Sequence, residues 1–102
     1  MARGNSRISV DIRIDFDDCS VVLLKPSDGP LMKNNVFCID PSGHELWNIK
    51  DIIKYPQPDY EDAYVALSKE SDHTFSLISF GGLYFVINID TLKIEEKHVM
   101  RF

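Results

Sequence analysis

Residues 7–16 alternate between apolar and polar side chains, and this alternation constrains the fold more than any other feature of the chain. The apolar positions are Ile8, Val10, Ile12, Ile14 and Phe16, and charged or hydroxyl side chains stand between them. A period of two residues is the period of a β-strand, in which successive side chains point to opposite faces. The segment therefore predicts a strand with one buried face and one solvated face.

Short apolar segments separated by turn-forming residues follow as far as the end of the chain. They occupy residues 21–24, 35–40, 45–50, 63–67, 74–80, 83–90 and 94–102. Pro41-Ser42-Gly43 and Gly81-Gly82 are typical of hairpin turns. Residues 51–55 fit one helical turn, and the charged last segment fits an edge strand. A spacing of about ten residues predicts an all-β antiparallel meander of about eight strands, folded as a small β-sandwich or a strongly bent sheet.

Length and composition fit one globular domain over residues 1–102. The chain is 44% hydrophobic and 26% charged, which is enough apolar material for a modest core. No apolar run is long enough to span a membrane as a helix. The first residues lack the apolar segment of a secretory signal, so we expect a cytoplasmic protein. A net charge of −5 argues against nucleic acid as the main partner.

No group of residues forms a known catalytic or metal-binding motif. The three histidines lie far apart, and the calcium-loop and nucleophile-elbow patterns are missing around the aspartates at 15–18 and around Ser42. We therefore expect no enzyme activity, no metal and no cofactor. Cys19 and Cys38 could pair, but two cysteines do not make a disulfide scaffold, and we expect Cys38 to be a buried, unreactive thiol.

One segment has the composition of a protein-binding loop. Residues 55–64 hold three tyrosines, two prolines and three carboxylates, and residues 51–72 carry a formal charge of −4 from six acidic and two basic residues. Prolines reduce the entropy lost on binding, tyrosines offer large contact areas, and carboxylates attract a basic partner. The predicted partner-binding residues are Tyr55, Asp59, Tyr60, Glu61 and Asp62.

The alternative for this loop is that its tyrosines pack over a sheet edge while its acids are merely solvated. Tyr64 begins a strand pattern, so of the three tyrosines it is the one we expect in the core. Both interpretations of the loop stay open from the sequence.

The segment from Val36 to Trp47 combines an apolar strand, an Asp-Pro-Ser-Gly turn and a Leu-Trp strand. Fifty residues later, the apolar run from Val86 to Ile89 also ends in an aspartate, Asp90, and a turn. The first segment resembles the hairpin of propeller blades in quinoprotein-like repeats. This resemblance implies β-hairpins and not a quinone cofactor, because two such units cannot close a propeller ring.

As a short, acidic, all-β chain with such a hairpin, the protein also resembles the immunity proteins of bacterial toxin systems, including contact-dependent growth inhibition. The resemblance implies a cytoplasmic, non-catalytic protein that binds a cognate toxin domain, often a basic nuclease, and occludes its active site. It implies no membrane partner. Two alternatives stay open: a structural protein that forms a homodimer through a strand edge, and a β-sandwich that binds or transforms a small ligand.

Overall fold

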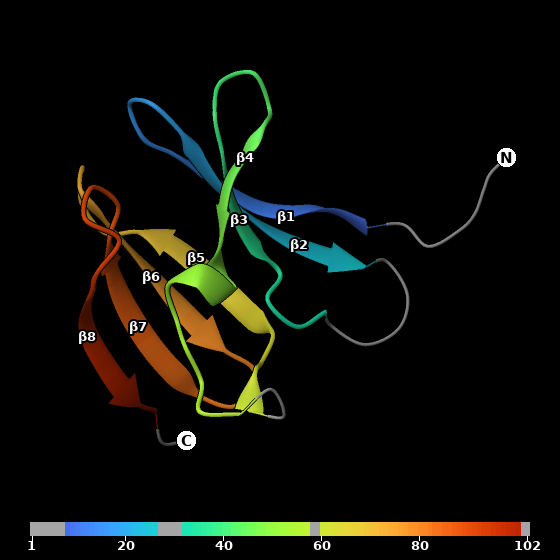
Figure 1. The fold of residues 1–102 in the computed structure, drawn as a ribbon, viewed down its shortest axis with the longest axis vertical. Coiled ribbons are helices and arrows are strands. Elements are labelled where there is room, and N and C mark those ends of the chain that lie inside the picture. Colours follow the sequence, from blue (N-terminus) through green and yellow to red (C-terminus); the bar gives the residue numbers. More distant parts are fainter. Residues whose placement is uncertain (1–7, 27–31, 58–59, 101–102) are drawn as a thin grey trace, which may run out of the picture.

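Two four-stranded antiparallel sheets make up the computed structural model, which describes residues 8–26, 32–57 and 60–100 (Figure 1). The first sheet contains β1 (Ile8–Asp15), β2 (Ser20–Pro26), β3 (Val36–Ile39) and β4 (Glu45–Asn48). The second contains β5 (Tyr64–Lys69), β6 (Thr74–Ser79), β7 (Leu83–Asn88) and β8 (Ile94–Val99). Within each sheet the strands follow one another in chain order. The predicted all-β meander is therefore confirmed, as a small sandwich.

The turn chemistry explains where the strands end. Gly43 and Gly82 have φ values of 90° and 94°, a conformation that glycine adopts without strain. After β4, the short 3₁₀ helix η1 (Ile49–Asp51) begins with a capping box, in which Asn48 and Asp51 each accept a backbone N–H of the other's segment. The expected helical turn thus exists, two residues earlier than predicted. The charged strand β8 lies at a sheet edge, as predicted.

A β-bulge in β1 corrects the prediction that the alternating residues 7–16 present one continuous apolar face. Val10 is paired with Leu24, but Ile12 is paired with Leu23, so Asp11 is an extra residue without a partner of its own. Leu23 and Leu24 point to opposite faces of the sheet, and Val10 therefore points away from Ile12. Val10 is 52% exposed on the outer face, whereas Ile12 packs against the core.

The core lies between the two sheets. Strands β2 and β3 contribute one side of it, β5, β6 and β7 contribute the other, and the segment after β4 closes it; the buried members are Val21, Leu23, Val36, Cys38, Ile49, Ile53, Tyr64, Leu67, Phe75, Leu77, Phe85 and Ile87. Each large side chain buried in this way stabilises the fold by about 1.5–3 kcal/mol relative to its exposed state. Tyr64 is fully buried, as expected.

A buried amide side chain joins the two sheets. Asn35 is fully buried, and its Nδ2 donates to the backbone oxygens of Leu24 (2.8 Å) and Tyr64 (3.0 Å). Its Oδ1 accepts the backbone N–H of Tyr64 at 2.8 Å. One side chain therefore fixes β5 against β2. Within the described ranges, no helix is long and apolar enough to cross a membrane.

Candidate functional site

Four turns meet at one end of the sandwich, which we call the hairpin end. They are residues 16–19, 40–44, 70–73 and 89–93, and they connect β1 to β2, β3 to β4, β5 to β6 and β7 to β8. In an up-and-down sheet every second turn lies at the same end, and the two sheets present these ends side by side (Figure 1). Segments far apart in the sequence are thereby brought to one surface.

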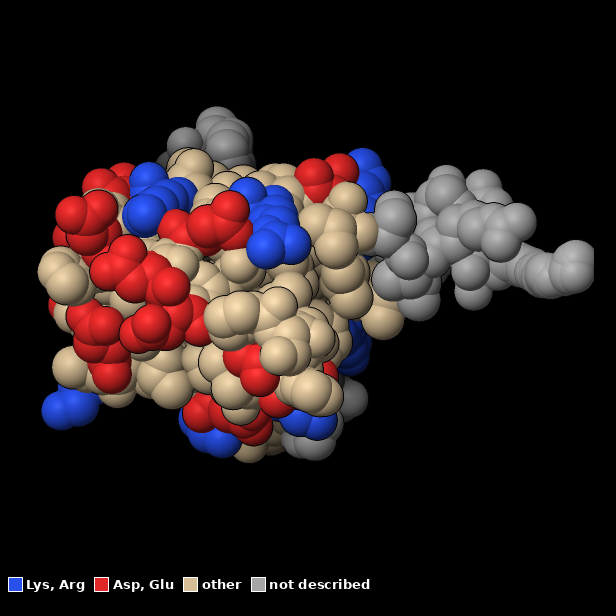
Figure 2. All heavy atoms as spheres, turned by 90° about the horizontal axis from the view of Figure 1, so that it is seen from above, with Lys and Arg blue, Asp and Glu red and all other residues tan. Residues whose placement is uncertain are grey.

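The hairpin end holds the negative charge of the molecule. Its four turns contain six acidic residues and one basic residue, which gives −5 with the histidines neutral, equal to the net charge of the whole chain. The acids are Asp17, Asp18, Asp40, Glu70, Asp72 and Asp90. Figure 2, seen from above Figure 1, looks onto this end, and the acidic side chains gather there over one side of the surface.

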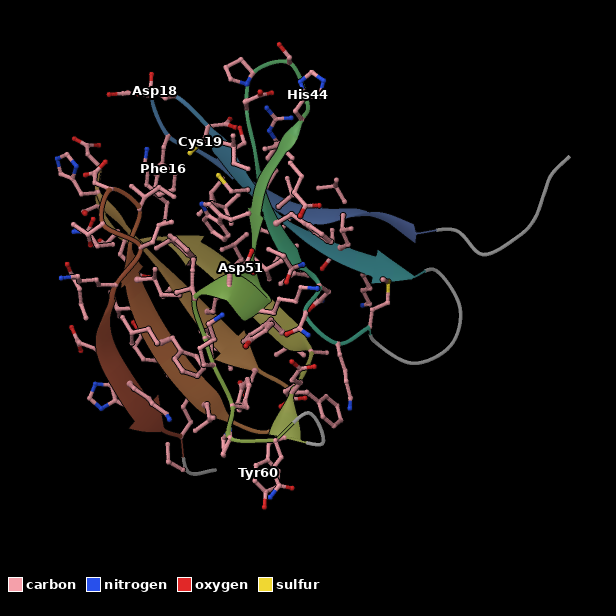
Figure 3. All side chains as sticks on the ribbon, viewed as in Figure 1. Phe16, Asp18, Cys19, His44, Asp51 and Tyr60 are labelled. Carbon is pink, nitrogen blue, oxygen red and sulfur yellow. The ribbon has the colours of Figure 1, made fainter. Side chains whose placement is uncertain are left out.

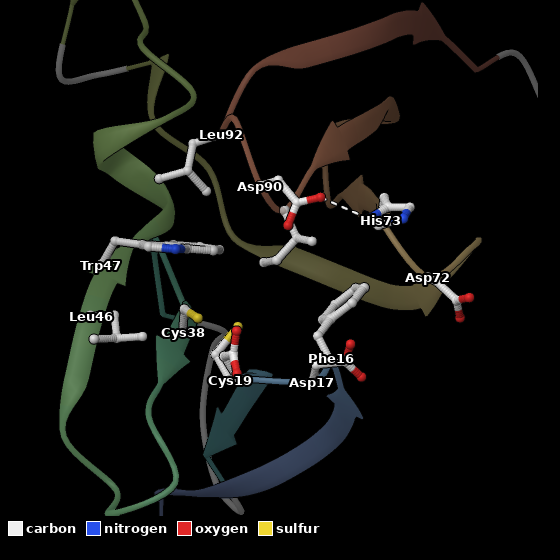
Figure 4. A pocket seen from close by; sticks show the side chains of 12 residues that line it. Phe16, Asp17, Cys19, Cys38, Leu46, Trp47, Asp72, His73, Asp90 and Leu92 are labelled. Carbon is white, nitrogen blue, oxygen red and sulfur yellow. Dashed lines mark hydrogen bonds and ion pairs between the residues drawn. The ribbon is translucent and has the colours of Figure 1, made fainter.

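A cleft of about 340 Å³ opens between the turns (Figure 4). Its apolar lining comes from both sheets and includes Phe16, Leu46, Trp47, Ile89 and Leu92, together with the two cysteines. Asp17, Asp18, Asp72, His73 and Asp90 also line it. The Trp47 ring is held by stacking on Phe75, with ring centroids 6.1 Å apart. The site therefore combines an apolar recess with several carboxylates.

Local hydrogen bonds fix several side chains at this end. His73 Nδ1 lies 2.7 Å from Asp90 Oδ2, and this pair joins two of the turns. The hydroxyl of Ser20 and the guanidinium of Arg13 lower the pKa of Asp15 below its ordinary value of 3.8. The backbone N–H groups of His44 and Ser42 lower the pKa of Asp40 in the same way. Both carboxyl groups are thus ionised at neutral pH.

The most strongly perturbed tyrosine and cysteine groups are not placed for acid–base chemistry. Burial raises the pKa of Tyr64 well above the usual range and that of Cys38 to about 12, so both stay protonated at neutral pH. Among the described residues, no three or more histidine, cysteine, aspartate or glutamate side chains are grouped so as to hold a metal ion.

The predicted binding loop lies at the opposite end of the molecule, where Figure 3 places Tyr60 far from Asp18 and His44. Tyr60 is 58% exposed. Tyr55 is half-buried, its hydroxyl lies 3.2 Å from that of Tyr64, and burial raises its pKa. Asp59 lies outside the described residues.

The two other predicted loop residues make hydrogen bonds within the protein. Glu61 accepts from Nδ2 of Asn34 at 3.2 Å. Asp62 accepts the N–H groups of Ala63 and Gly81, each at 2.8 Å, and so ties the loop to the turn between β6 and β7. In that turn Phe80 is 74% exposed, a surface aromatic that the sequence analysis assigned only to a strand.

The charge of residues 51–72 is divided between the two ends of the molecule. Strand β5 has six residues, so it carries the chain about 20 Å from the predicted loop to the hairpin end. Glu70 and Asp72 therefore lie with Asp17, Asp18 and Asp90, not with Glu61 and Asp62. This grouping was not predicted from the sequence, although one signal was present: every second turn of the predicted meander contains at least one aspartate.

The internal similarity at residues 36–40 and 86–90 corresponds to equivalent places in the two sheets. Each segment covers the third strand of its sheet and the turn to the fourth strand. In the first turn Asp40 accepts the N–H groups of Ser42 and His44, and in the second Asn88 accepts those of Asp90 and Thr91. The implied β-hairpins are therefore present in both sheets.

No family model matches the chain, and comparisons with curated proteins and with solved structures found no match.

Proposed function

We propose that this protein is a non-catalytic binding module that recognises a basic surface on another protein through the hairpin end. The observation that carries the proposal is the convergence of carboxylates from three separate turns around a cleft with apolar walls. Leu46 and Trp47 belong to that lining, and Leu46 is 54% exposed. An apolar centre surrounded by charge is the usual composition of a protein–protein interface.

The charge supports fast and selective association more than tight binding by any single contact. An exposed ion pair contributes only about 0–1 kcal/mol, so no one carboxylate decides the affinity. Several carboxylates on one surface act together at long range and raise the rate at which a basic partner docks in the right orientation. The cleft then adds contact for an apolar stem or an aromatic ring of the partner.

In its finer form, the proposal is that the protein is an immunity protein for a toxin domain, with a basic nuclease as the favoured partner. A nuclease groove binds phosphates with cationic side chains. A rigid patch of carboxylates at the hairpin end would form ion pairs with these cationic side chains and exclude the nucleic acid from the groove. The small size, the acidity and the all-β texture of the chain support this form. A toxin gene next to the gene for this chain would identify the partner to be used in the test.

The kinetics of association provide the test. One variant combines Asp17→Asn, Asp72→Asn and Asp90→Asn, and a matched control combines Asp11→Asn, Glu95→Gln and Glu96→Gln on exposed strand positions with the same change in charge. With the catalytically inactivated toxin domain as the probe, we expect the first variant to associate about tenfold or more slowly and with a weaker dependence on salt. Equal rates for the two variants would contradict the proposed interface.

The predicted loop is tested in the same assay with Tyr60→Ala and Phe80→Ala. Both side chains are exposed, so truncation leaves the core intact. The hairpin-end proposal expects both variants to bind the toxin domain like the unmodified chain. A loss of affinity of tenfold or more in these variants alone would move the interface to the loop end.

Self-association is the alternative function, and sedimentation separates it from the proposal. A homodimer formed through a strand edge would show a sedimentation coefficient that rises with protein concentration. The hairpin-end proposal needs only a monomer.

A further inference from the structure

Two free thiols meet in the wall of the hairpin-end cleft. Cys19 lies in the turn between β1 and β2 and is half-buried, whereas Cys38 lies on β3 and is fully buried. In the pairing of β2 with β3, Cys38 stands opposite Val21, two residues after Cys19. Both side chains belong to the lining of the cleft, and Figure 4 shows their sulfur atoms next to each other.

We propose that Cys19 and Cys38 form a redox pair, which closes to a disulfide when a low-molecular-weight disulfide enters the cleft and reopens with a thiol reductant. Both residues line the cleft, so a small reagent can reach Cys19 there. Cys38 has no exposed surface, so its only accessible reaction partner is the neighbouring Cys19. This arrangement favours an internal disulfide over a cross-link between two chains.

The reaction is two successive thiol–disulfide exchanges. The Cys19 thiol loses its proton to solvent, and the thiolate attacks one sulfur of glutathione disulfide, which breaks that S–S bond and releases one glutathione. The Cys38 thiol then loses its proton and attacks the Cys19 sulfur of the mixed disulfide, which releases the second glutathione. The two protein thiols are oxidised by two electrons, and one glutathione disulfide is reduced to two thiols.

The second exchange is the slow one. Burial and the neighbouring Cys19 raise the pKa of Cys38 to about 12, so little thiolate is present at neutral pH. Four carboxylates line the cleft around the pair and disfavour the negative charge of a Cys38 thiolate: Asp17, Asp18, Asp72 and Asp90. The other titratable group in the lining is His73. We therefore expect closure to accelerate as the pH rises.

Closure would affect the carboxylates of the proposed interface. Cys19 directly follows Asp17 and Asp18, so a bond from Cys19 to β3 fixes the position of that turn. We therefore expect oxidation to change the rate of partner binding, and this expectation rests on the proposed function. Formation of the disulfide itself does not depend on the proposed function.

The test uses the full chain treated with glutathione disulfide at mildly alkaline pH, quenched with acid and analysed by intact mass and by a non-reducing peptide map. Cleavage at Lys33 separates the two cysteines. We expect a mass lower by two hydrogen atoms, one linked pair of peptides, and full reversal by dithiothreitol. Trp47 is the only tryptophan and stands opposite Cys38 on β4, so its fluorescence should fall as the disulfide forms.

Two variants assign the steps. Cys38→Ala should stop at a mixed disulfide of Cys19 with glutathione, and Cys19→Ala should not react while folded. The peptide map of the unmodified chain remains decisive if either variant fails to fold. A product that stays at the mixed disulfide, or that links two chains, would overturn the redox pair. A clean internal disulfide with unchanged binding to the toxin domain would retain the pair and overturn only its effect on the interface.

Discussion

At the scale of single residues, buried polar contacts hold the two sheets together. Asn35 uses both its donor and its acceptor group on backbone atoms of β2 and β5. A buried polar group that loses its partner costs about 1–3 kcal/mol, because water no longer replaces the lost hydrogen bond. A side chain that satisfies three backbone atoms therefore has a large effect on the free energy of unfolding.

We expect Asn35→Ala to lower the free energy of unfolding by about 3–5 kcal/mol, since it leaves the N–H and C=O of Tyr64 and the C=O of Leu24 without this partner. Urea denaturation monitored by circular dichroism measures the change. Ser68→Ala, at an exposed position of the same strand β5, is the control and should change stability by less than about 0.5 kcal/mol. A similar small change for Asn35→Ala would show that the bridge between the sheets is not needed.

Asp40 gives a prediction for the dependence of stability on pH. Its pKa in the folded state lies below the ordinary value of 3.8, because the N–H groups of His44 and Ser42 donate to the carboxylate. A lowered folded-state pKa gives a contribution to stability that is complete above the ordinary pKa and is lost as the pH falls through the folded-state value.

The urea midpoint of unfolding should fall in both proteins between neutral pH and about pH 3, and it should fall less in Asp40→Asn than in the unmodified chain. Midpoints of urea denaturation at the two pH values measure the difference. Parallel losses in both proteins would mean that the Asp40 carboxylate does not respond to acid as its hydrogen bonds indicate.

At the scale of elements, the strands and hairpins follow from local chemistry. The β1 bulge is the place where the structure differs from the local sequence pattern. Asp11 is the residue without a partner in β2. Its removal would leave Val10 opposite Leu24 and Ile12 opposite Leu23 in a regular ladder. Removal of Arg13, inside the regular part of the pairing, would instead shift Ile12 toward the outer face.

Deletion of Asp11 should thus lower the melting temperature by a few degrees at most, whereas deletion of Arg13 should lower it by about 10 °C or more. Thermal denaturation of both deletion variants, followed by circular dichroism, checks the difference. Equal losses would contradict the assigned bulge. Both variants shorten β1 by one residue, so each controls for the deletion itself.

The elements were predictable because their signals are local. Alternation in β1 and the turn residues at Pro41-Ser42-Gly43 and Gly81-Gly82 act within a few residues, and the structure contains the corresponding strands and hairpins. The division into two sheets depends on contacts between distant segments, such as Asn35 with Tyr64. The pattern of residues within a single segment does not predict such contacts. The predicted loop had a local signal too, but the hydrogen bonds of Glu61 and Asp62 connect it to other segments.

At the scale of the whole molecule, topology turns scattered aspartates into one surface. Every second turn of each of the two meanders lies at one end, so acids more than seventy positions apart, such as Asp17 and Asp90, line one cleft. The opposite end carries the exposed aromatics Tyr60 and Phe80. The two ends therefore differ in chemistry, and a partner that recognises charge and a partner that recognises aromatic surface would choose different ends.

The central claim, that the hairpin end is the binding surface, is tested most directly by mapping backbone amide shifts in NMR spectra of the isotope-labelled chain as the toxin domain is added. If the proposed toxin domain is the partner, the largest changes fall in residues 16–19, 40–44, 70–73 and 89–93. Changes centred on Tyr60 and Phe80, with the four turns unaffected, would contradict the claim.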